Sequence, residues 1–167
     1  MIVAIIIGLL IVFVIGAGAL FGAPFVPTRK IWIADALKLA DISRNDTVVD
    51  LGSGDGAVLK CALECGAKKA IGYEINPLLA LVSRIRLRKF RERAIVKTRD
   101  FFHEDLPADT TVIYLFGVGR IMPKIARYLA KQRPKLTSRT VKVVTFGFAI
   151  PDMKMVHERK GMKLYEF

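Results

Sequence analysis

A run of apolar residues that ends in alternating glycines constrains this sequence most. Residues 48–56 read Val-Val-Asp-Leu-Gly-Ser-Gly-Asp-Gly, so an apolar stretch passes directly into the segment Gly52–Gly56, which we call the glycine turn. Glycine allows a tight turn and a close approach of the backbone to a ligand. A helix that begins at Ala57 would present free N–H groups to the same space. The segment therefore predicts a strand, a ligand-binding turn and a helix in succession.

The rest of the chain alternates between helical and strand patterns. Apolar spacing and the positions of glycine and proline set the expected elements. Helices are expected at 29–39, 57–65, 77–90 and 122–131, and strands at 47–51, 70–73, 95–98, 111–116 and 141–148. Residues 154–167 are expected to form a hairpin about Lys160-Gly161. Repeated strand–helix units imply an α/β fold with a mostly parallel sheet and helices on both faces.

The first part of the chain is apolar and carries no charge. Residues 2–21 would reach about 30 Å as a helix, which matches the hydrocarbon core of a bilayer. A cleaved signal peptide is the main alternative and a buried core helix the other. A signal peptide has a basic residue before a shorter apolar run, whereas the first basic residue here is Arg29. We therefore predict a transmembrane helix over 1–22, a Pro-containing connector over 23–30 and one domain over 31–167.

All the charge lies after the apolar segment. Lys and Arg total 27 against 15 Asp and Glu, which gives a net charge of +12. Because basic residues flank the cytoplasmic end of membrane helices, Arg29 and Lys30 predict a single-pass membrane protein whose domain faces the cytoplasm. Residues 84–99, the basic cluster, hold eight basic residues and one acid. Contact with anionic lipid, binding of nucleic acid and a plain solvated helix end all fit such a cluster.

A carboxylate stands at the end of the second expected strand. Ile71-Gly72-Tyr73-Glu74 places Glu74 24 residues after Asp50, where a carboxylate can accept hydrogen bonds from ribose hydroxyls. The glycine turn lacks the G-x-G-x-x-G spacing of dinucleotide sites, and no G-K-[ST] follows it, which excludes a phosphate-binding P-loop. The turn and the acid together resemble the seven-strand S-adenosylmethionine-dependent methyltransferases.

This resemblance implies a Rossmann-like methyltransferase sheet with S-adenosyl-L-methionine as the cofactor. In that family the glycine turn packs against the methionine part of the cofactor, and the acid at the tip of strand two holds the ribose. By resemblance, Asp50 lies beneath the turn and Asp100 meets the adenine amine. The cofactor-binding residues implied in this way are Asp50, Gly52, Ser53, Gly54, Glu74, Asp100 and Phe101.

Further motifs resemble a narrower group. Residues 24–28 (Pro-Phe-Val-Pro-Thr), 72–77 (Gly-Tyr-Glu-Ile-Asn-Pro) and 116–118 (Phe-Gly-Val) occur together with the glycine turn. The set is similar to the membrane-anchored protein-lysine methyltransferases that act on the mitochondrial ATP synthase c-subunit and on the adenine nucleotide translocase, and to their prokaryotic relatives. The resemblance implies that the connector helps to build the active site, with Phe25 and Thr28 near the transferred methyl group.

Two more residues are candidates for the substrate pocket. They are Asp55 at the entrance of the helix and Phe116 after the fourth strand. Asp55 supplies a carboxylate and Phe116 an aromatic face, and both kinds of group can hold an amine. The catalytic residue itself is left unassigned. Arg29 and Ala57 stand where the narrower group usually has proline and arginine, which leaves the substrate open. Leu115–Gly119 lacks the [DN]-P-P-[YF] motif of nucleic-acid amino methyltransferases, which disfavours a base amine as the acceptor.

The sequence thus predicts a methyltransferase that acts on a lysine of a membrane protein, with its catalytic domain on the cytoplasmic side. An RNA or small-molecule methyltransferase with the same cofactor site is one alternative, and a non-catalytic membrane-bound module of this fold is another. The expected partners are the membrane and a protein substrate, with nucleic acid less favoured. No metal site is predicted, because Cys61 and Cys65 lie one helical turn apart without further ligands nearby.

Overall fold

The computed structural model describes residues 30–117 and 119–167. The predicted transmembrane helix over 1–22, nearly all of the connector, Phe25 and Thr28 lie outside the described residues, so these predictions stay predictions. Within the described part of the chain, no helix combines the length and the apolar character needed to cross a bilayer.

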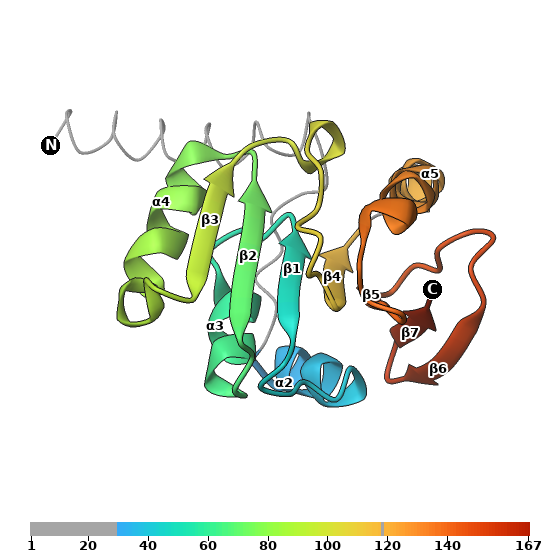
Figure 1. Cartoon of the computed structure of the whole chain (residues 1–167), viewed down its shortest axis with the longest axis horizontal. Helices are drawn as coiled ribbons and strands as arrows, with labels where there is room; N and C mark the ends of the chain where they lie inside the picture. The colour runs from blue at the N-terminus through green and yellow to red at the C-terminus, as the bar shows by residue number, and fades with distance from the viewer. Residues whose placement is uncertain (1–29, 118) are drawn as a thin grey trace, which may run out of the picture.

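The described residues form one seven-stranded sheet in the order β3-β2-β1-β4-β5-β7-β6 (Figure 1). The neighbours from β3 through β5 pair in parallel, whereas β7 runs antiparallel to β5 and β6. The strands are β1 (Thr47–Leu51), β2 (Lys69–Glu74), β3 (Ala94–Thr98), β4 (Val112–Phe116), β5 (Lys142–Phe146), β6 (Met155–Arg159) and β7 (Met162–Glu166). The predicted α/β fold and mostly parallel sheet are confirmed.

The C-terminal strands follow the predicted hairpin. Lys160 and Gly161 take positive φ angles of 52° and 79°, the conformation that a two-residue hairpin turn requires. The strand predicted over 141–148 is longer than β5, which ends at Phe146. Gly147 follows it with a φ of 85°, outside the range of an extended strand. The chain therefore turns there, at the same edge of the sheet as the glycine turn.

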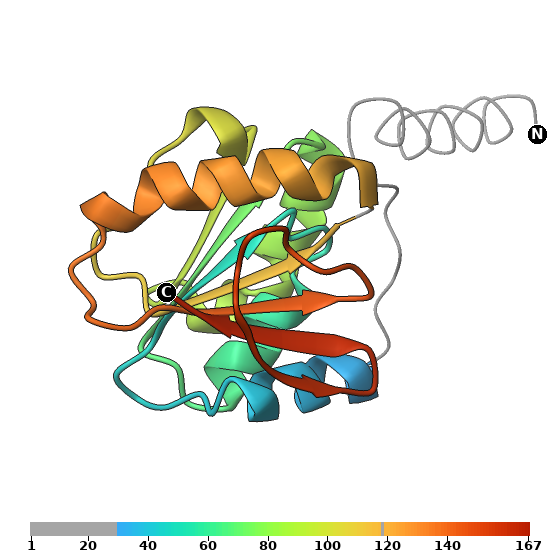
Figure 2. The ribbon, with the colours of Figure 1, turned by 90° about the vertical axis from the view of Figure 1, so that its right-hand side faces the viewer.

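Helices cover both faces of the sheet (Figures 1 and 2). The main helices are α2 (Lys30–Leu39), α3 (Ala57–Glu64), α4 (Pro77–Arg86) and α5 (Met122–Gln132). Val48 and Val112 pack in a cluster with residues of α2 and α3, while Val49 and Ile113 pack in a cluster with residues of α5. Successive strand residues point to opposite faces, so the fully buried strand β1 supplies both layers.

The start of α4 follows its sequence signature. The Asn76 side chain accepts hydrogen bonds from the backbone N–H groups of Leu78 (2.9 Å) and Leu79 (3.3 Å), and Pro77 occupies the first turn. The single helix predicted over 77–90 is divided in the structure. After α4 ends, the short 3-10 helix η1 (Arg88–Phe90) completes the segment.

The connections place one functional edge on the sheet. The strands after β1 are added first on one side, as β2 and β3, and then on the other side, as β4 and β5. The boundary between β1 and β4 is therefore a topological switch point, where α/β folds bind ligands. Leu51 of β1 pairs with Leu115 of β4. The glycine turn and Phe116 therefore emerge side by side at the carboxyl edge of the sheet.

Candidate functional site

The glycine turn is fixed to the neighbouring strand by backbone hydrogen bonds. The N–H groups of Gly52 and Ser53 both donate to the carbonyl oxygen of Tyr73, each at 2.9 Å. Gly52 and Gly54 have φ angles of 94° and 53°, which residues other than glycine seldom adopt. A Cβ atom built on Gly52 meets nothing within 4 Å. The turn thus has a fixed shape and open space at its first glycine.

Glu74 holds the glycine turn from below and is itself almost fully buried. Its Oε2 accepts a hydrogen bond from Gly54 N–H at 2.8 Å, and its Oε1 accepts one from Asn76 N–H at 2.7 Å. A carboxylate offers about four lone-pair positions, so these two bonds leave acceptor capacity on both oxygens. Glu74 is therefore a preorganised acceptor between the turn and the start of α4.

A second carboxyl group is buried at the end of β1. Asp50 is only 2% exposed, and its burial, followed by the neighbouring Glu74 and Asp55 carboxylates, raises the pKa of Asp50 well above its ordinary value. Asp50 thus lies buried in β1, two residues before the glycine turn, and its role toward the cofactor stays a prediction.

Close packing explains the glycines that face neighbouring elements. A Cβ atom on Gly56 would approach Ser83 Oγ on α4 to 2.2 Å, and one on Gly72 would approach Ser53 Oγ to 2.4 Å. The hydroxyl oxygens of Ser53 and Ser83 are buried, with no hydrogen-bond partner among the described residues. These glycines let α4 and β2 approach the turn more closely than any side chain would permit.

Asp100 stands at the same edge, directly after β3. The backbone N–H of Arg99 donates to the carbonyl oxygen of Glu74 at 3.1 Å, which brings the loop after β3 against the tip of β2. The Asp100 carboxylate caps the short helix η2 (Phe101–His103) by accepting Phe102 N–H at 3.0 Å. The structure thus gathers the predicted cofactor residues of the first three strands along one edge.

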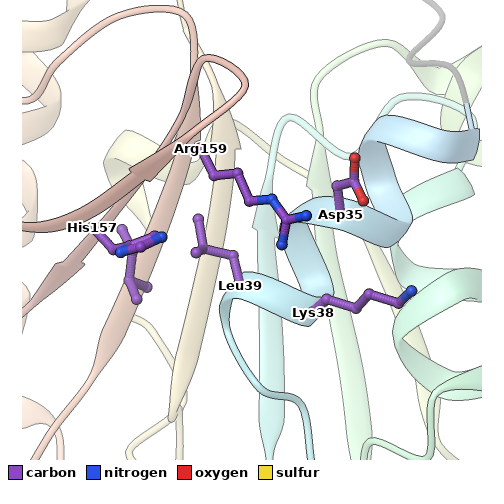
Figure 3. Close-up of a pocket in the computed structure, with 6 residues that line it drawn as sticks. Asp35, Lys38, Leu39, His157 and Arg159 are labelled. Carbon is purple, nitrogen blue, oxygen red and sulfur yellow. The ribbon is translucent and has the colours of Figure 1, made fainter.

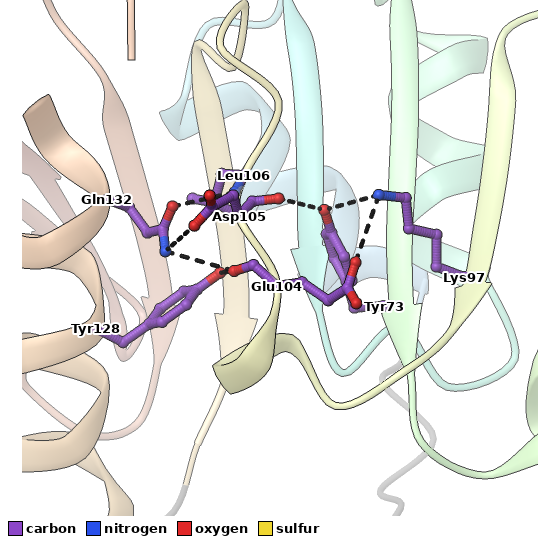
Figure 4. Close-up of polar contacts among 7 residues, drawn as sticks. All are labelled: Tyr73, Lys97, Glu104, Asp105, Leu106, Tyr128 and Gln132. Carbon is purple, nitrogen blue, oxygen red and sulfur yellow. Dashed lines mark hydrogen bonds and ion pairs between the residues drawn. The ribbon is translucent and has the colours of Figure 1, made fainter. Parts of the chain in front are cut away.

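A polar network holds the loop after η2 against α5 (Figure 4). Tyr73 donates to the carbonyl oxygen of Asp105 and Tyr128 to that of Glu104, both at 3.1 Å. Gln132, buried on α5, donates to the same Glu104 oxygen at 3.4 Å. Burial raises the pKa of Tyr73 to about 12, so its hydroxyl remains a donor at neutral pH. The network links α5 to the loop that also carries Asp100.

On the other side of the glycine turn the edge is aromatic. Phe116 at the end of β4 stacks on Phe146 at the end of β5, with ring centroids 5.9 Å apart. Phe146 in turn stacks on Trp32 of α2 at 5.1 Å. Trp32 remains 37% exposed. We call these three residues the aromatic row. Trp32 and Phe146 were not among the candidates, because only the fold brings them to Phe116.

The other candidate for the substrate pocket has local partners. Asp55 Oδ2 forms an ion pair with Arg86 of α4 at 2.6 Å, and its Oδ1 accepts the N–H of Ala57 at 3.2 Å. The carboxylate therefore caps α3 and links it to α4. Its role at the substrate stays a prediction, as do the roles of Phe25 and Thr28.

A separate pocket of about 300 Å³ opens between α2 and the β6–β7 hairpin (Figure 3). Asp35 and Lys38 approach it from α2, and His157 and Arg159 approach it from β6. A hydrogen bond from Lys160, at 3.0 Å, lowers the pKa of Asp35. None of its lining residues belongs to the glycine turn or to the aromatic row.

The fold and the strand-tip geometry define the class of the protein. The sheet order, the antiparallel β7 and a glycine turn above a strand-tip carboxylate are those of S-adenosylmethionine-dependent methyltransferases. An RNA methyltransferase from Salinibacter ruber, solved in complex with S-adenosyl-L-homocysteine, superimposes with a TM-score of 0.74. It is 28% identical, and the match covers 85% of this chain and 92% of that one.

The family is narrower than the fold class. Residues 50–157, more than half of the chain, match the sequence model of the ANTKMT methyltransferase domain, so the chain belongs to that family. An ATP synthase C-subunit lysine N-methyltransferase of Xenopus laevis is 37% identical over 110 residues, which are 64% of this chain and 46% of that protein. A protein-lysine N-methyltransferase of Saccharolobus islandicus is 30% identical over 112 residues, which are 65% of this chain and 69% of that protein.

These relatives bear out the resemblance that the motifs indicate. The chain spans about half the length of the vertebrate relatives it matches. The S-adenosyl-L-homocysteine bound in the Salinibacter structure is what S-adenosylmethionine becomes after methyl transfer, and it supports S-adenosylmethionine as the cofactor of this fold. Here the open space at Gly52 and the free acceptor capacity of Glu74 fit such a cofactor.

Proposed function

We propose that this protein transfers the methyl group of S-adenosylmethionine to a lysine side chain of a membrane protein. The observation that carries the proposal is that the aromatic row starts at Phe116, on the strand next to the glycine turn, and extends along the same edge of the sheet. One side of this edge offers a fixed acceptor for a ribose, and the other offers aromatic faces suited to an amine.

The residues of the glycine turn bind and orient the cofactor in this proposal. Glu74 would accept hydrogen bonds from the ribose hydroxyls, and the backbone of Gly52 and Gly54 would pass close to the methionine part of the cofactor. Asp100 would face the adenine amine. When bound, S-adenosylmethionine supplies a methyl group on a positively charged sulfur, which needs alignment rather than activation by the protein. The fixed hydrogen bonds of Glu74 to Gly54 and Asn76 support such alignment.

The aromatic row receives the acceptor. Aromatic faces attract ammonium groups by about 0.5–2 kcal/mol and also pack against the methylene stem of lysine. An amine must lose its proton to the solvent before it can attack a methyl group, and withdrawal of the amine from water favours the neutral form. Trp32, Phe146 and Phe116 would therefore hold the lysine and help to exclude water.

The membrane part of the proposal rests on the sequence. The uncharged segment over 2–21 and the basic residues after it support a single-pass protein whose catalytic domain faces the cytoplasm. A membrane anchor raises the local concentration of substrates in the same membrane. The name of the Xenopus relative gives the ATP synthase C-subunit as its substrate.

A labelled-methyl assay tests this function. The full chain in detergent would be incubated with S-adenosylmethionine carrying a labelled methyl group and with membrane fractions, and the products would be hydrolysed to amino acids. We expect label in methyl-lysine, and we expect none with Glu74→Ala. Label in methyl-arginine alone, or equal labelling by Glu74→Ala, would contradict the proposal.

An RNA acceptor is the second candidate. The Salinibacter protein with a TM-score of 0.74 is an RNA methyltransferase, and the basic cluster suits a phosphate backbone. The same assay with total RNA distinguishes the two candidates, because label would then appear in nucleosides and not in lysine.

A further inference from the structure

The outer face of α4 exposes large aliphatic side chains. Leu78, Leu81, Val82 and Ile85 follow the spacing i, i+3, i+4, i+7 and are 42%, 51%, 45% and 58% exposed. Ile75, immediately before the helix, is 51% exposed. These five residues form one continuous stripe, which we call the outer face of α4. Helices of soluble proteins normally turn polar side chains outward, so α4 has the reverse of the usual arrangement, with an apolar outer face.

The reversal follows from how α4 packs. Its side toward the sheet carries the small residues Ala80 and Ser83, both fully buried. Ser83 lies against Gly56, so only a small residue fits there. At Ser83, α4 approaches the glycine turn too closely for a leucine or isoleucine to fit between them. Among the described residues, no element covers the outer face, and α4 stands beside the edge strand β3 (Figure 1).

Positive charge follows the stripe directly in the sequence. Arg88 and Lys89 follow Ile85 by three and four residues, and Arg91 comes next; all three are exposed. Within the described residues, none of the three forms an ion pair with a carboxylate. In contrast, Arg86 of the same helix is paired with Asp55. The aliphatic stripe therefore ends in cations that are available to an anionic partner.

We propose that the outer face of α4 docks on the surface of an anionic membrane. The aliphatic side chains would enter the boundary between head groups and acyl chains, and Arg88, Lys89 and Arg91 would meet the phosphate groups. Because Ile75 directly follows Glu74, this docking holds the carboxyl edge of the sheet near the bilayer. The proposal does not depend on the chemistry of the acceptor.

Charge argues for a membrane rather than a second copy of the chain. Two copies pairing through this face would bring together two proteins that each carry a net charge of +12. The stripe also lacks the tyrosine and tryptophan residues that are typical of protein interfaces. An anionic lipid surface suits both the aliphatic side chains and the cations.

Site-specific fluorescence in vesicles tests the docking. In the full chain, with Cys61→Ala and Cys65→Ala, a single cysteine at Leu81→Cys would carry an environment-sensitive dye. The matched control places the dye at Ala130→Cys, an exposed position on α5 across the sheet. Because both proteins keep residues 2–21, any anchoring by that segment is the same. The vesicles would contain a lipid-bound quencher and either phosphatidylglycerol or phosphatidylcholine alone.

We expect the dye at residue 81 to shift to the blue and to be quenched in the anionic vesicles, while the dye at residue 130 is not. Replacing two charges, Arg88→Gln with Lys89→Gln, should lower the ratio of docked to undocked protein about thirtyfold at roughly 1 kcal/mol per charge. Equal quenching at both positions, or equal quenching in both kinds of vesicle, would overturn the proposal. So would a blue shift without lipid quenching, which would mean that a second copy or another segment covers the face.

Discussion

The carboxyl edge of the sheet has two halves that are built differently. The cofactor half, comprising the glycine turn and Glu74, is largely buried, and backbone N–H groups donate to the Tyr73 carbonyl oxygen and the Glu74 carboxylate at 2.7–2.9 Å. The aromatic row gathers residues from α2, β4 and β5, whose rings stack on one another. Fixed polar partners suit a ligand with polar groups at set positions, whereas stacked rings suit the methylene stem and the amine of an acceptor.

The largest effect is expected in the cofactor half, from Gly56→Ala. The new Cβ would meet Ser83 at 2.2 Å, and the φ of 78° disfavours any side chain. Strain and overpacking together should lower the free energy of unfolding by about 2–5 kcal/mol. Urea unfolding of the chain in detergent measures the change.

Gly147→Ala is the matched control at the other half of the edge. Its φ is 85°, but a Cβ there meets nothing within 4 Å. Only the backbone strain of about 1–2 kcal/mol should therefore appear. Equal losses for the two variants would mean that α4 does not press on the glycine turn.

Glu74→Gln is expected to weaken cofactor binding without changing the acceptor side. The amide has one acceptor oxygen, so either Gly54 N–H or Asn76 N–H loses its partner, and the negative charge disappears. The loss of one charge-assisted hydrogen bond corresponds to about a 10- to 100-fold higher dissociation constant for S-adenosylhomocysteine. Calorimetric titration measures this dissociation constant. An unchanged value in a folded variant would show that Glu74 does not contribute to the cofactor site.

Trp32→Leu should weaken binding of the acceptor and leave binding of the cofactor unchanged, the opposite of Glu74→Gln. The loss of one aromatic face is expected to raise the KM for the lysine acceptor about 2- to 30-fold, with binding of S-adenosylhomocysteine unchanged. Trp32→Phe keeps a ring and should restore most of the loss. If the leucine variant weakened cofactor and acceptor alike, the two halves would not be separate.

The sequence predicted the cofactor half because its signals are local. The glycine turn and the Asn76 cap follow from backbone geometry at those residues, and Glu74 was assigned from its place at a strand end and from the family resemblance. The aromatic row joins Trp32 to Phe146, which lie 114 residues apart, so no spacing rule reveals it. The apolar spacing of α4 likewise did not reveal whether its apolar face points to the sheet or outward, since periodicity indicates a face but not what covers it.

The smallest expected effect is that of Tyr128→Phe, which tests whether the polar network beneath the cofactor half is a support or part of the site. The substitution removes a 3.1 Å hydrogen bond to the carbonyl oxygen of Glu104. That oxygen keeps Gln132 Nε2 as a donor at 3.4 Å, so no buried acceptor is left without a partner. Urea unfolding should therefore show a loss at the low end of about 0.5–1.5 kcal/mol, with unchanged binding of S-adenosylhomocysteine. A weakened affinity at unchanged stability would instead mean that α5 positions the loop carrying Asp100 for the cofactor.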